Sequence, residues 1–233
     1  NICRCTGYKK IMDAVELAAK IKREGKGIPK KEFTWKLGER VHRVDAREKT
    51  LGYGEYVDDM EVEGLLHASA VRSKYPRARV LSIDTEKAKA VPGIVDIFTA
   101  ADIPGDVKVG HLVQDWDTMI PVGSITHYLG DAIALVVGEN LDVVEKAKKL
   151  VKVEYEELPF VSSPYEAMKE DAPQVHGSGN LLAHKHVSRG NAKEAIANAK
   201  YVYTEEFHTP WTEHALLEPE CAIAMPYEDG VLI

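Results

Sequence analysis

The sequence predicts an α/β (α+β) protein, because short apolar runs typical of strands alternate with amphipathic helical stretches. The strand-like runs are Leu65 to Val71, Ala78 to Ile83, Ile94 to Phe98, Ala132 to Val137 and Val151 to Tyr155. Helices are expected over 85–90 and, most clearly, over 141–150, where the apolar residues share one face and Asn140 suits the N-cap.

Residues 11–32, which precede these strands, show a different sequence pattern. From Ile11 the apolar residues recur at the i, i+3, i+4 and i+7 spacing of an amphipathic helix that ends near Gly25. Residues 25–32 are rich in glycine and lysine and have no periodicity, which is the composition of an exposed linker. We therefore expect a domain boundary in this linker.

The stretch after Leu158-Pro159 reads first as an irregular connection, because prolines and glycines recur without periodicity up to about Gly179. A short helix is then expected over 191–199, and strands over 201–207 and 221–225. The chain begins on Asn1 rather than Met and stops at Ile233 inside an apparent strand, so we interpret it as a piece of a longer protein.

Composition narrows the class of function. The formal net charge of −7 argues against the broad positive field that nonspecific nucleic-acid binding requires. No apolar run approaches the length of a membrane span and no leader opens the chain, so neither nucleic acid nor membrane is an expected partner. Three cysteines cannot form a secreted disulfide framework, and we expect a cytoplasmic location.

The segment Cys3-Arg4-Cys5 carries the clearest chemistry in the sequence. Two thiolates separated by one residue can face one metal centre, and the N-terminus of the following helix offers free N–H groups to an anionic cluster. The same spacing is also compatible with two free thiols near a terminus.

The octet Asn1 to Tyr8 resembles the end of the second [2Fe-2S] domain in the molybdenum hydroxylases of the xanthine dehydrogenase and aldehyde oxidoreductase family. The resemblance implies that Cys3 and Cys5 are two of four cluster ligands and that Gly7 and Tyr8 shape the turn into the helix. Since such a cluster takes four thiolates, this chain alone is expected to bind none.

The resemblance continues along the chain. Residues 44–59 look like the opening of the α/β hammerhead domain of that family, and landmarks such as Gly130-Asp131-Ala132 follow in order. Gly190 to Ala199 and Glu213 to Glu220 look like the first elements of the molybdopterin-binding domain. The implied organisation is a helical iron-sulfur remnant over 1–24, a linker over 25–44, the hammerhead domain over 45–158, and the connection with the first molybdopterin-binding elements over 159–233.

By resemblance, the intact protein is an enzyme that hydroxylates a purine, aldehyde or N-heterocycle with water as the oxygen source. It would hold molybdopterin and [2Fe-2S] clusters and pass electrons to an external acceptor. No FAD domain fits between Gly25 and Asp45. The resemblance places no catalytic residue in this chain, which would act with the remainder of the same polypeptide, and it allows a homodimer.

Other patterns give weaker hypotheses. Histidines 176, 184, 186, 208 and 214 with Glu213 match no closed zinc motif, and exposed or hydrogen-bonded histidines are expected instead. Gly52-Tyr53-Gly54 and Asp58-Asp59 are expected in turns, Cys221 as a buried thiol in a strand, and the cations of 20–31 on a solvated linker that could also steer an acidic partner. The alternative to an enzyme segment is a noncatalytic module for subunit contact or assembly.

Overall fold

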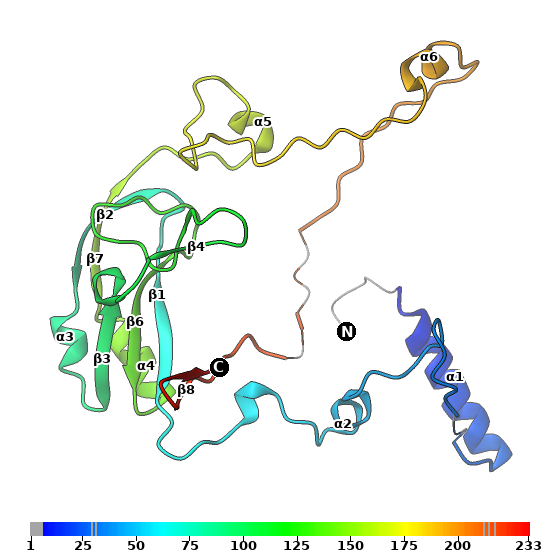
Figure 1. Ribbon diagram of the computed structural model, residues 1–233, viewed down its shortest axis with the longest axis horizontal. Helices are drawn as coiled ribbons and strands as arrows, with labels where there is room; N and C mark the ends of the chain where they lie inside the picture. The colour runs from blue at the N-terminus through cyan, green and yellow to red at the C-terminus, as the bar shows by residue number, and fades with distance from the viewer. Residues whose placement is uncertain (1–6, 29, 31, 212, 214, 217) are drawn as a thin grey trace. The chain divides into compact units, whose positions relative to one another are not determined.

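The computed structural model describes residues 7–28, 30, 32–211, 213, 215–216 and 218–233. The chain divides into two compact units, which are Val62–Asn198 and the residues that flank it on both sides. Figure 1 shows the mixture of helices and strands that the sequence predicts, which confirms the α/β (α+β) class. No helix of the described residues is long and apolar enough to cross a lipid bilayer.

The helices and strands have the following bounds. The flanking unit contains α1 (Lys9–Glu24), α2 (Ala46–Leu51), the 3-10 helix η1 (Val57–Asp59), β8 (Met225–Tyr227) and β9 (Gly230–Leu232). The unit Val62–Asn198 contains β1 (His67–Arg72), β2 (Ala78–Asp84), α3 (Glu86–Lys89), β3 (Ile94–Thr99), the 3-10 helix η2 (Ala100–Asp102), β4 (Lys108–Val109), β5 (Trp116–Asp117), β6 (Ala132–Gly138), α4 (Leu141–Lys148), β7 (Lys152–Glu157), α5 (Pro164–Ala167) and α6 (Ala192–Ala197).

Helix α1 confirms the prediction from periodicity. It ends at Gly25, which adopts the left-handed conformation with φ 64° and donates its N–H to the Ile21 carbonyl. Glycine suits this position because a Cβ is disfavoured there. The apolar stripe of α1, which includes Ile11 and Val15, is exposed to solvent in this chain.

Strand β6 is the centre of the main sheet, whose order is β1-β6-β3 with both pairings antiparallel. Strands β2 and β7 form a second, two-stranded antiparallel sheet. All five strands lie where the sequence predicts strands. Gly138 at the end of β6 lies so close to the turn that precedes β3 that a Cβ on Gly138 would stand 3.0 Å from the Gly93 carbonyl oxygen.

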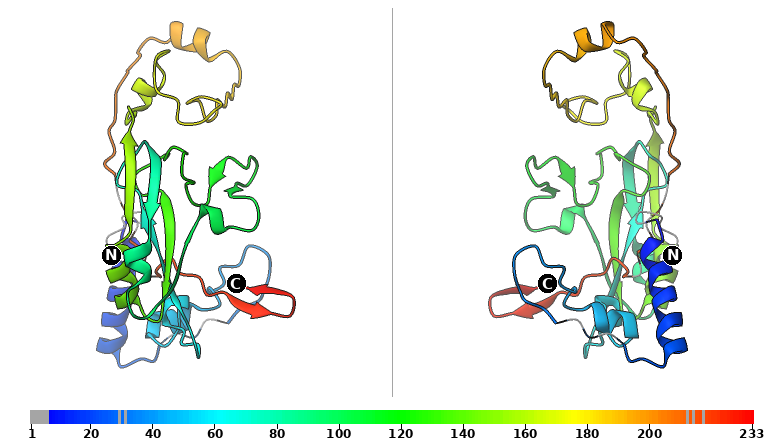
Figure 2. Two further views of the ribbon diagram at one scale, coloured as in Figure 1. Left: turned by 90° about the vertical axis from the view of Figure 1, so that its left-hand side faces the viewer. Right: turned by 90° about the vertical axis from the view of Figure 1, so that its right-hand side faces the viewer.

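Two apolar clusters bury the opposite faces of β6. Ala134 and Val136 point into a cluster with α3, β3 and α4, whereas Ile133 points into a cluster with Val80 and Ile120. Figure 2 shows α3 and α4 against the sheet, with the β4–β5 hairpin on the side away from them. Burial on both faces explains why 132–137 is a continuous apolar run rather than an alternating one.

Helix α4 begins as predicted at Asn140, whose side-chain oxygen accepts a hydrogen bond from the Val143 N–H at 3.0 Å. Val144 and Ala147 on its inner face are buried. The cap satisfies one of the free N–H groups at the helix start, so the helix can pack its apolar face onto β1 and β6.

Three predictions for the last part of the chain are wrong. Residues 201–207 form no strand, although their composition favours one, and of 221–225 only Met225 lies in a strand. Cys221 is exposed rather than buried. A strand needs a hydrogen-bonded neighbour, and the described residues offer none to 201–207. The helix expected over 191–199 is confirmed as the shorter α6.

The carboxylate of Asp102 in η2 should make the stability of the protein depend on pH. The Asp102 carboxylate accepts hydrogen bonds from the Thr99 N–H at 2.7 Å and the Thr99 hydroxyl at 2.9 Å, and these bonds lower its pKa below 3.8. A lowered pKa in the folded state contributes stability above the unfolded pKa and loses it as the pH falls. In urea unfolding, the stability that Asp102→Asn removes should therefore shrink between about pH 6 and about pH 3. A difference that stays constant over this range would contradict the assignment.

Candidate functional site

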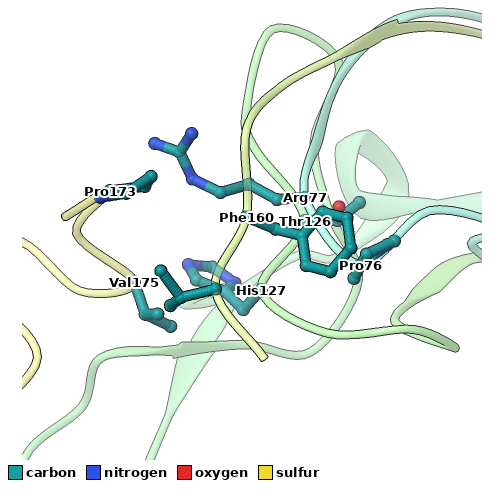
Figure 3. Close-up of a pocket in the computed structure, with 8 residues that line it drawn as sticks. Pro76, Arg77, Thr126, His127, Phe160, Pro173 and Val175 are labelled. Carbon is teal, nitrogen blue, oxygen red and sulfur yellow. The ribbon is translucent and has the colours of Figure 1, made fainter. Parts of the chain in front are cut away.

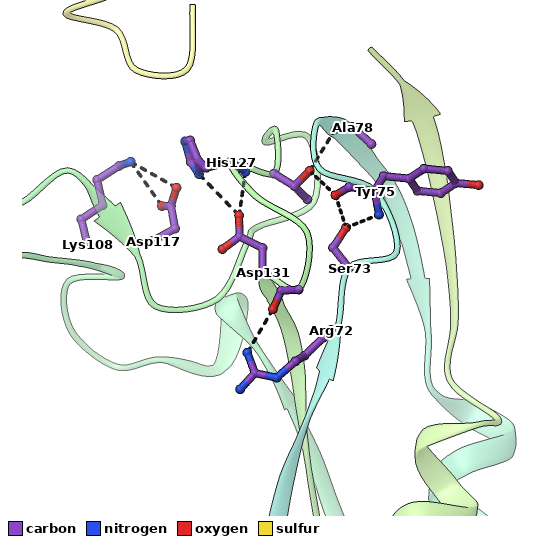
Figure 4. A network of polar contacts seen from close by, with 10 residues as sticks. Arg72, Ser73, Tyr75, Ala78, Lys108, Asp117, His127 and Asp131 are labelled. Atoms are coloured by element: carbon purple, nitrogen blue, oxygen red, sulfur yellow. Dashed lines mark hydrogen bonds and ion pairs between the residues drawn. The ribbon is translucent and has the colours of Figure 1, made fainter. Parts of the chain in front are cut away.

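A polar network joins the end of β1 to the turn before β6 (Figure 4). The Asp131 side chain is 2% exposed, and one of its oxygens accepts the His127 backbone N–H at 2.6 Å and lies 3.7 Å from His127 Nδ1. Ser73 N–H donates to the Asp131 carbonyl at 2.7 Å, and Gly130 N–H donates to the Ser73 carbonyl at 3.1 Å. The network fixes the turn 127–131, and with it the His127 ring.

Thr126 ties the same turn to the start of β2. Its buried hydroxyl accepts the Ala78 N–H at 2.9 Å and donates to the Tyr75 carbonyl at 3.2 Å. Its backbone N–H donates to the Ala78 carbonyl at 2.9 Å. One side chain therefore satisfies two backbone groups that are shielded from water.

We expect Thr126→Val to lower the free energy of unfolding by about 1–3 kcal/mol, because valine keeps the shape but leaves the Ala78 N–H without its partner and removes one of the two hydroxyls, those of Ser73 and Thr126, that donate to the Tyr75 carbonyl. Chemical denaturation measures the change. Thr118→Val is the matched control, since the Thr118 hydroxyl donates to the Val107 carbonyl from an exposed site where water can replace it. Equal losses in the two variants would show that the buried bonds of Thr126 have no special weight.

A groove of about 450 Å³ opens beside this network. Four segments line it, namely the start of β2, the β4–β5 hairpin, the turn 123–127 and the connection 174–177. Its lining residues are Arg77, Arg79, Lys108, Asp117, Gly123, Ser124, Ile125, His127, Gln174, Val175, His176 and Gly177. A smaller hollow of about 40 Å³ adjoins it, and in Figure 3 the Arg77 and His127 side chains point across that hollow toward Pro173 and Val175.

Aromatic and imidazole rings gather at the edge of the groove. The rings of His127 and His176 stack with centroids 5.5 Å apart and an interplanar angle of 13°. Trp116 lies within 6.3 Å of both rings and 5.5 Å from the Tyr128 ring. Ring contacts of this kind hold the connection 174–177 against the turn that carries His127.

The cluster ligands that the resemblance implies, Cys3 and Cys5, lie outside the described residues. Within the described ranges, no group of three or more histidine, cysteine or acidic side chains could hold a metal ion. The exposed Cys221 likewise has no companion ligand.

The remaining histidines considered as zinc ligands can also be placed. His184 and His186 are exposed, and His208 lies 3.1 Å from the Glu206 carboxylate on the surface. His214 lies outside the described residues.

The two turn predictions and the cationic stretch can also be placed. Gly52 ends α2 with φ 84°, and the Asp59 carboxylate accepts the Tyr56 N–H at 2.9 Å at the start of η1. Both segments are thus structural. Among the cations of 20–31, Lys26 pairs with Glu24 at 2.7 Å on an exposed surface.

Sequence reasoning missed the groove. His127 and His176 are far apart in the sequence, and no short-range pattern indicates that their rings stack. In the resemblance Gly130-Asp131 is only a landmark, although a carboxylate beside an apolar strand is a signal of a buried, hydrogen-bonded group. The contact between His127 and His176 depends on how the connection 174–177 folds back onto the turn 123–127.

The described residues among those expected to begin the molybdopterin-binding domain form no enclosed cofactor site. Of the described residues in 181–233, all are exposed except the half-buried Ile223. Aromatic side chains such as Tyr203, Phe207 and Trp211 face solvent. None of these described residues is a buried polar group aimed at a cofactor.

The chain is similar to known proteins along most of its length. Residues 51–159 match the family model described as aldehyde oxidase and xanthine dehydrogenase, a/b hammerhead domain, and residues 175–233 match the molybdopterin cofactor-binding domain. The chain is 30% identical to the aldehyde oxidoreductase of Megalodesulfovibrio gigas over 99% of its own length and 27% of that protein. It is 34% identical to the xanthine dehydrogenase molybdenum-binding subunit of Escherichia coli O157:H7 over 81% of its length and 26% of that subunit.

A solved structure agrees with these matches. The aldehyde oxidoreductase from Desulfovibrio gigas superposes with a TM-score of 0.67 at 30% identity, over 86% of this chain and 24% of that one. The chain thus spans about a quarter of the length of these relatives. The hammerhead match, the cofactor-domain match after it and the structural likeness agree, and the chain belongs to the xanthine dehydrogenase and aldehyde oxidoreductase family of molybdenum hydroxylases.

Proposed function

We propose that this chain is part of a molybdenum-dependent oxidoreductase that hydroxylates a purine, an aldehyde or an N-heterocycle, with water as the source of oxygen. The observation that carries the proposal is the hammerhead match followed directly by the molybdopterin cofactor-binding match in one chain. The proposed substrate classes are those of relatives, which include a xanthine dehydrogenase subunit, an aldehyde oxidoreductase and a nicotinate dehydrogenase subunit.

In this proposal the unit Val62–Asn198 is a scaffold. Its core lies on both faces of β6, and it positions the chain that leads into the cofactor-binding segment. The molybdenum cofactor, when bound, supplies the redox chemistry, and protein groups supply binding and orientation. The residues that contact substrate and cofactor are proposed to come from the remainder of the polypeptide, so the 233-residue chain alone would be inactive.

Cys3 and Cys5 are proposed as two of the four ligands of a [2Fe-2S] cluster, with two further thiolates supplied by the same polypeptide. Electrons would leave through such clusters to an external acceptor. Between Gly25 and Asp45 the chain has no room for a flavin domain, which supports an acceptor outside this segment. A cytoplasmic location is proposed because a reducing compartment keeps these thiols available to iron.

Metal analysis of the intact gene product tests the proposal. Purified enzyme should contain molybdenum by mass spectrometry and show the visible absorption of [2Fe-2S] clusters that bleaches on reduction. Xanthine, an aldehyde and nicotinate, offered separately with an artificial electron acceptor, should separate the three substrate classes by rate. An intact protein with neither molybdenum nor cluster absorption would rule the proposal out.

A further inference from the structure

Most residues that line the groove beside the turn 123–131 belong to the hammerhead match, and Val175, His176 and Gly177 are the first three residues of the cofactor-binding match over 175–233. It lies within the compact unit Val62–Asn198, so its shape does not depend on how the two units are placed. It has three cationic side chains in its lining and one carboxylate. Such an excess of positive charge is local, since the whole chain has a formal net charge of −7.

Two of the three cations already have acidic partners. Lys108 Nζ lies 3.2 Å from the Asp117 carboxylate, and Arg79 Nε lies 3.3 Å from Glu156. Arg77 is different, because its guanidinium donates to the uncharged Pro159 carbonyl at 2.9 Å. Among the described residues no carboxylate lies within ion-pair distance of Arg77.

Arg77 also occupies a central position. It lines the groove, the smaller hollow and a third hollow of about 410 Å³ that Tyr75 and Phe160 also line, so the half-buried Arg77 residue stands where the three cavities meet. A guanidinium has five N–H donors in a planar fork that matches the oxygens of phosphate and carboxylate groups. With one N–H bonded to Pro159, the fork keeps donors for a ligand.

Further polar side chains complete the lining. The imidazoles of His127 and His176 stack at its edge, and His127 is held in place by Asp131. The Ser124 hydroxyl and the Gln174 amide add further donors. Such a set of polar groups suits the three terminal oxygens of a phosphate group, which offer more acceptor positions than the two oxygens of a carboxylate.

We propose that this groove is a binding site for a phosphate group, with Arg77 as its principal ligand and the side chains of His127, His176 and Ser124 as further hydrogen-bonding partners. The site does not rest on the proposed hydroxylase chemistry. A volume of about 450 Å³ leaves room for the organic part of a phosphorylated molecule beside the phosphate.

Titration of the ¹⁵N-labelled chain with inorganic phosphate, at constant ionic strength, tests this assignment by NMR. We expect saturable shifts of the Gly123, Ser124 and Gly177 amides, which line the groove. Arg77→Gln should weaken the apparent affinity about tenfold, the loss expected for one charge-assisted interaction. Acetate at the same ionic strength should bind more weakly than phosphate.

Two further variants guard against a trivial result. Gln174→Glu adds a negative charge on an exposed rim residue and should also weaken binding, even if Arg77→Gln were to unfold. Lys146→Gln on the exposed side of α4 removes one positive charge away from the groove and should leave the affinity unchanged. Shifts that do not saturate, equal binding by acetate, or equal weakening in Lys146→Gln would each overturn the proposal.

Discussion

Replacing Val136 by aspartate should lower the free energy of unfolding of the unit Val62–Asn198 by about 4 kcal/mol or more, which is a large fraction of the roughly 5–15 kcal/mol that stabilises an ordinary domain. Val136 is fully buried in the centre of β6 and packs against Ile97, Val144 and Ala147. A carboxylate there would lose its hydration with no cation to pair with. Urea unfolding followed by circular dichroism measures the loss.

Val95→Asp is the matched control, because Val95 is 56% exposed on the neighbouring strand β3. The same chemical change should cost only about 1 kcal/mol there, through β-propensity and lost surface packing. If Val136→Asp unfolded at the same urea concentration as Val95→Asp, the assignment of β6 as the doubly buried central strand would be wrong.

In the intact enzyme, Cys5→Ser should abolish the electron paramagnetic resonance signal of one [2Fe-2S] cluster and slow turnover by roughly 100-fold or more, because a hydroxyl replaces a thiolate ligand of iron. The molybdenum content should remain unchanged, since the cofactor-binding match begins at residue 175, far along the chain. Metal analysis and spectroscopy of the same preparation distinguish cluster loss from general misfolding.

Cys221→Ser provides the comparison for this variant. Cys221 is an exposed free thiol with no companion ligand among the described residues, so its replacement should leave both the signal and the turnover intact. A Cys5→Ser enzyme that kept every cluster signal and its normal rate would remove Cys5 from the ligand set.

Periodicity was sufficient for the principal elements of the unit Val62–Asn198. The apolar run of β6 is continuous because both faces of the strand are buried. The sequence of α4 is recognisable because its amphipathic pattern follows Asn140, which caps the free N–H groups of the helix N-terminus. The strands β4 and β5 have only two residues each and left no pattern to detect. Tyr201 to Phe207 carries a strand-like composition, but strand formation depends on a partner that composition does not reveal.

The groove likewise could not be predicted from local sequence patterns. The stacking of His127 on His176 and the position of Arg77 among three cavities arise from contacts between segments distant in the sequence. Local sequence could suggest only that Asp131, next to the buried β6, would need hydrogen bonds. The family, in contrast, is recognisable from the sequence because its motifs follow one another along the chain in the family's order. The two family-model matches confirm it.

The origin of the oxygen atom in the product tests the central claim most directly. The intact enzyme, turning over its fastest substrate with an artificial acceptor in ¹⁸O-labelled water, should place one labelled oxygen in the hydroxylated product under ordinary air. Labelled dioxygen in ordinary water should give unlabelled product. Label that came from dioxygen, or a product that gained no oxygen, would contradict a molybdenum hydroxylase function for the protein that contains this chain.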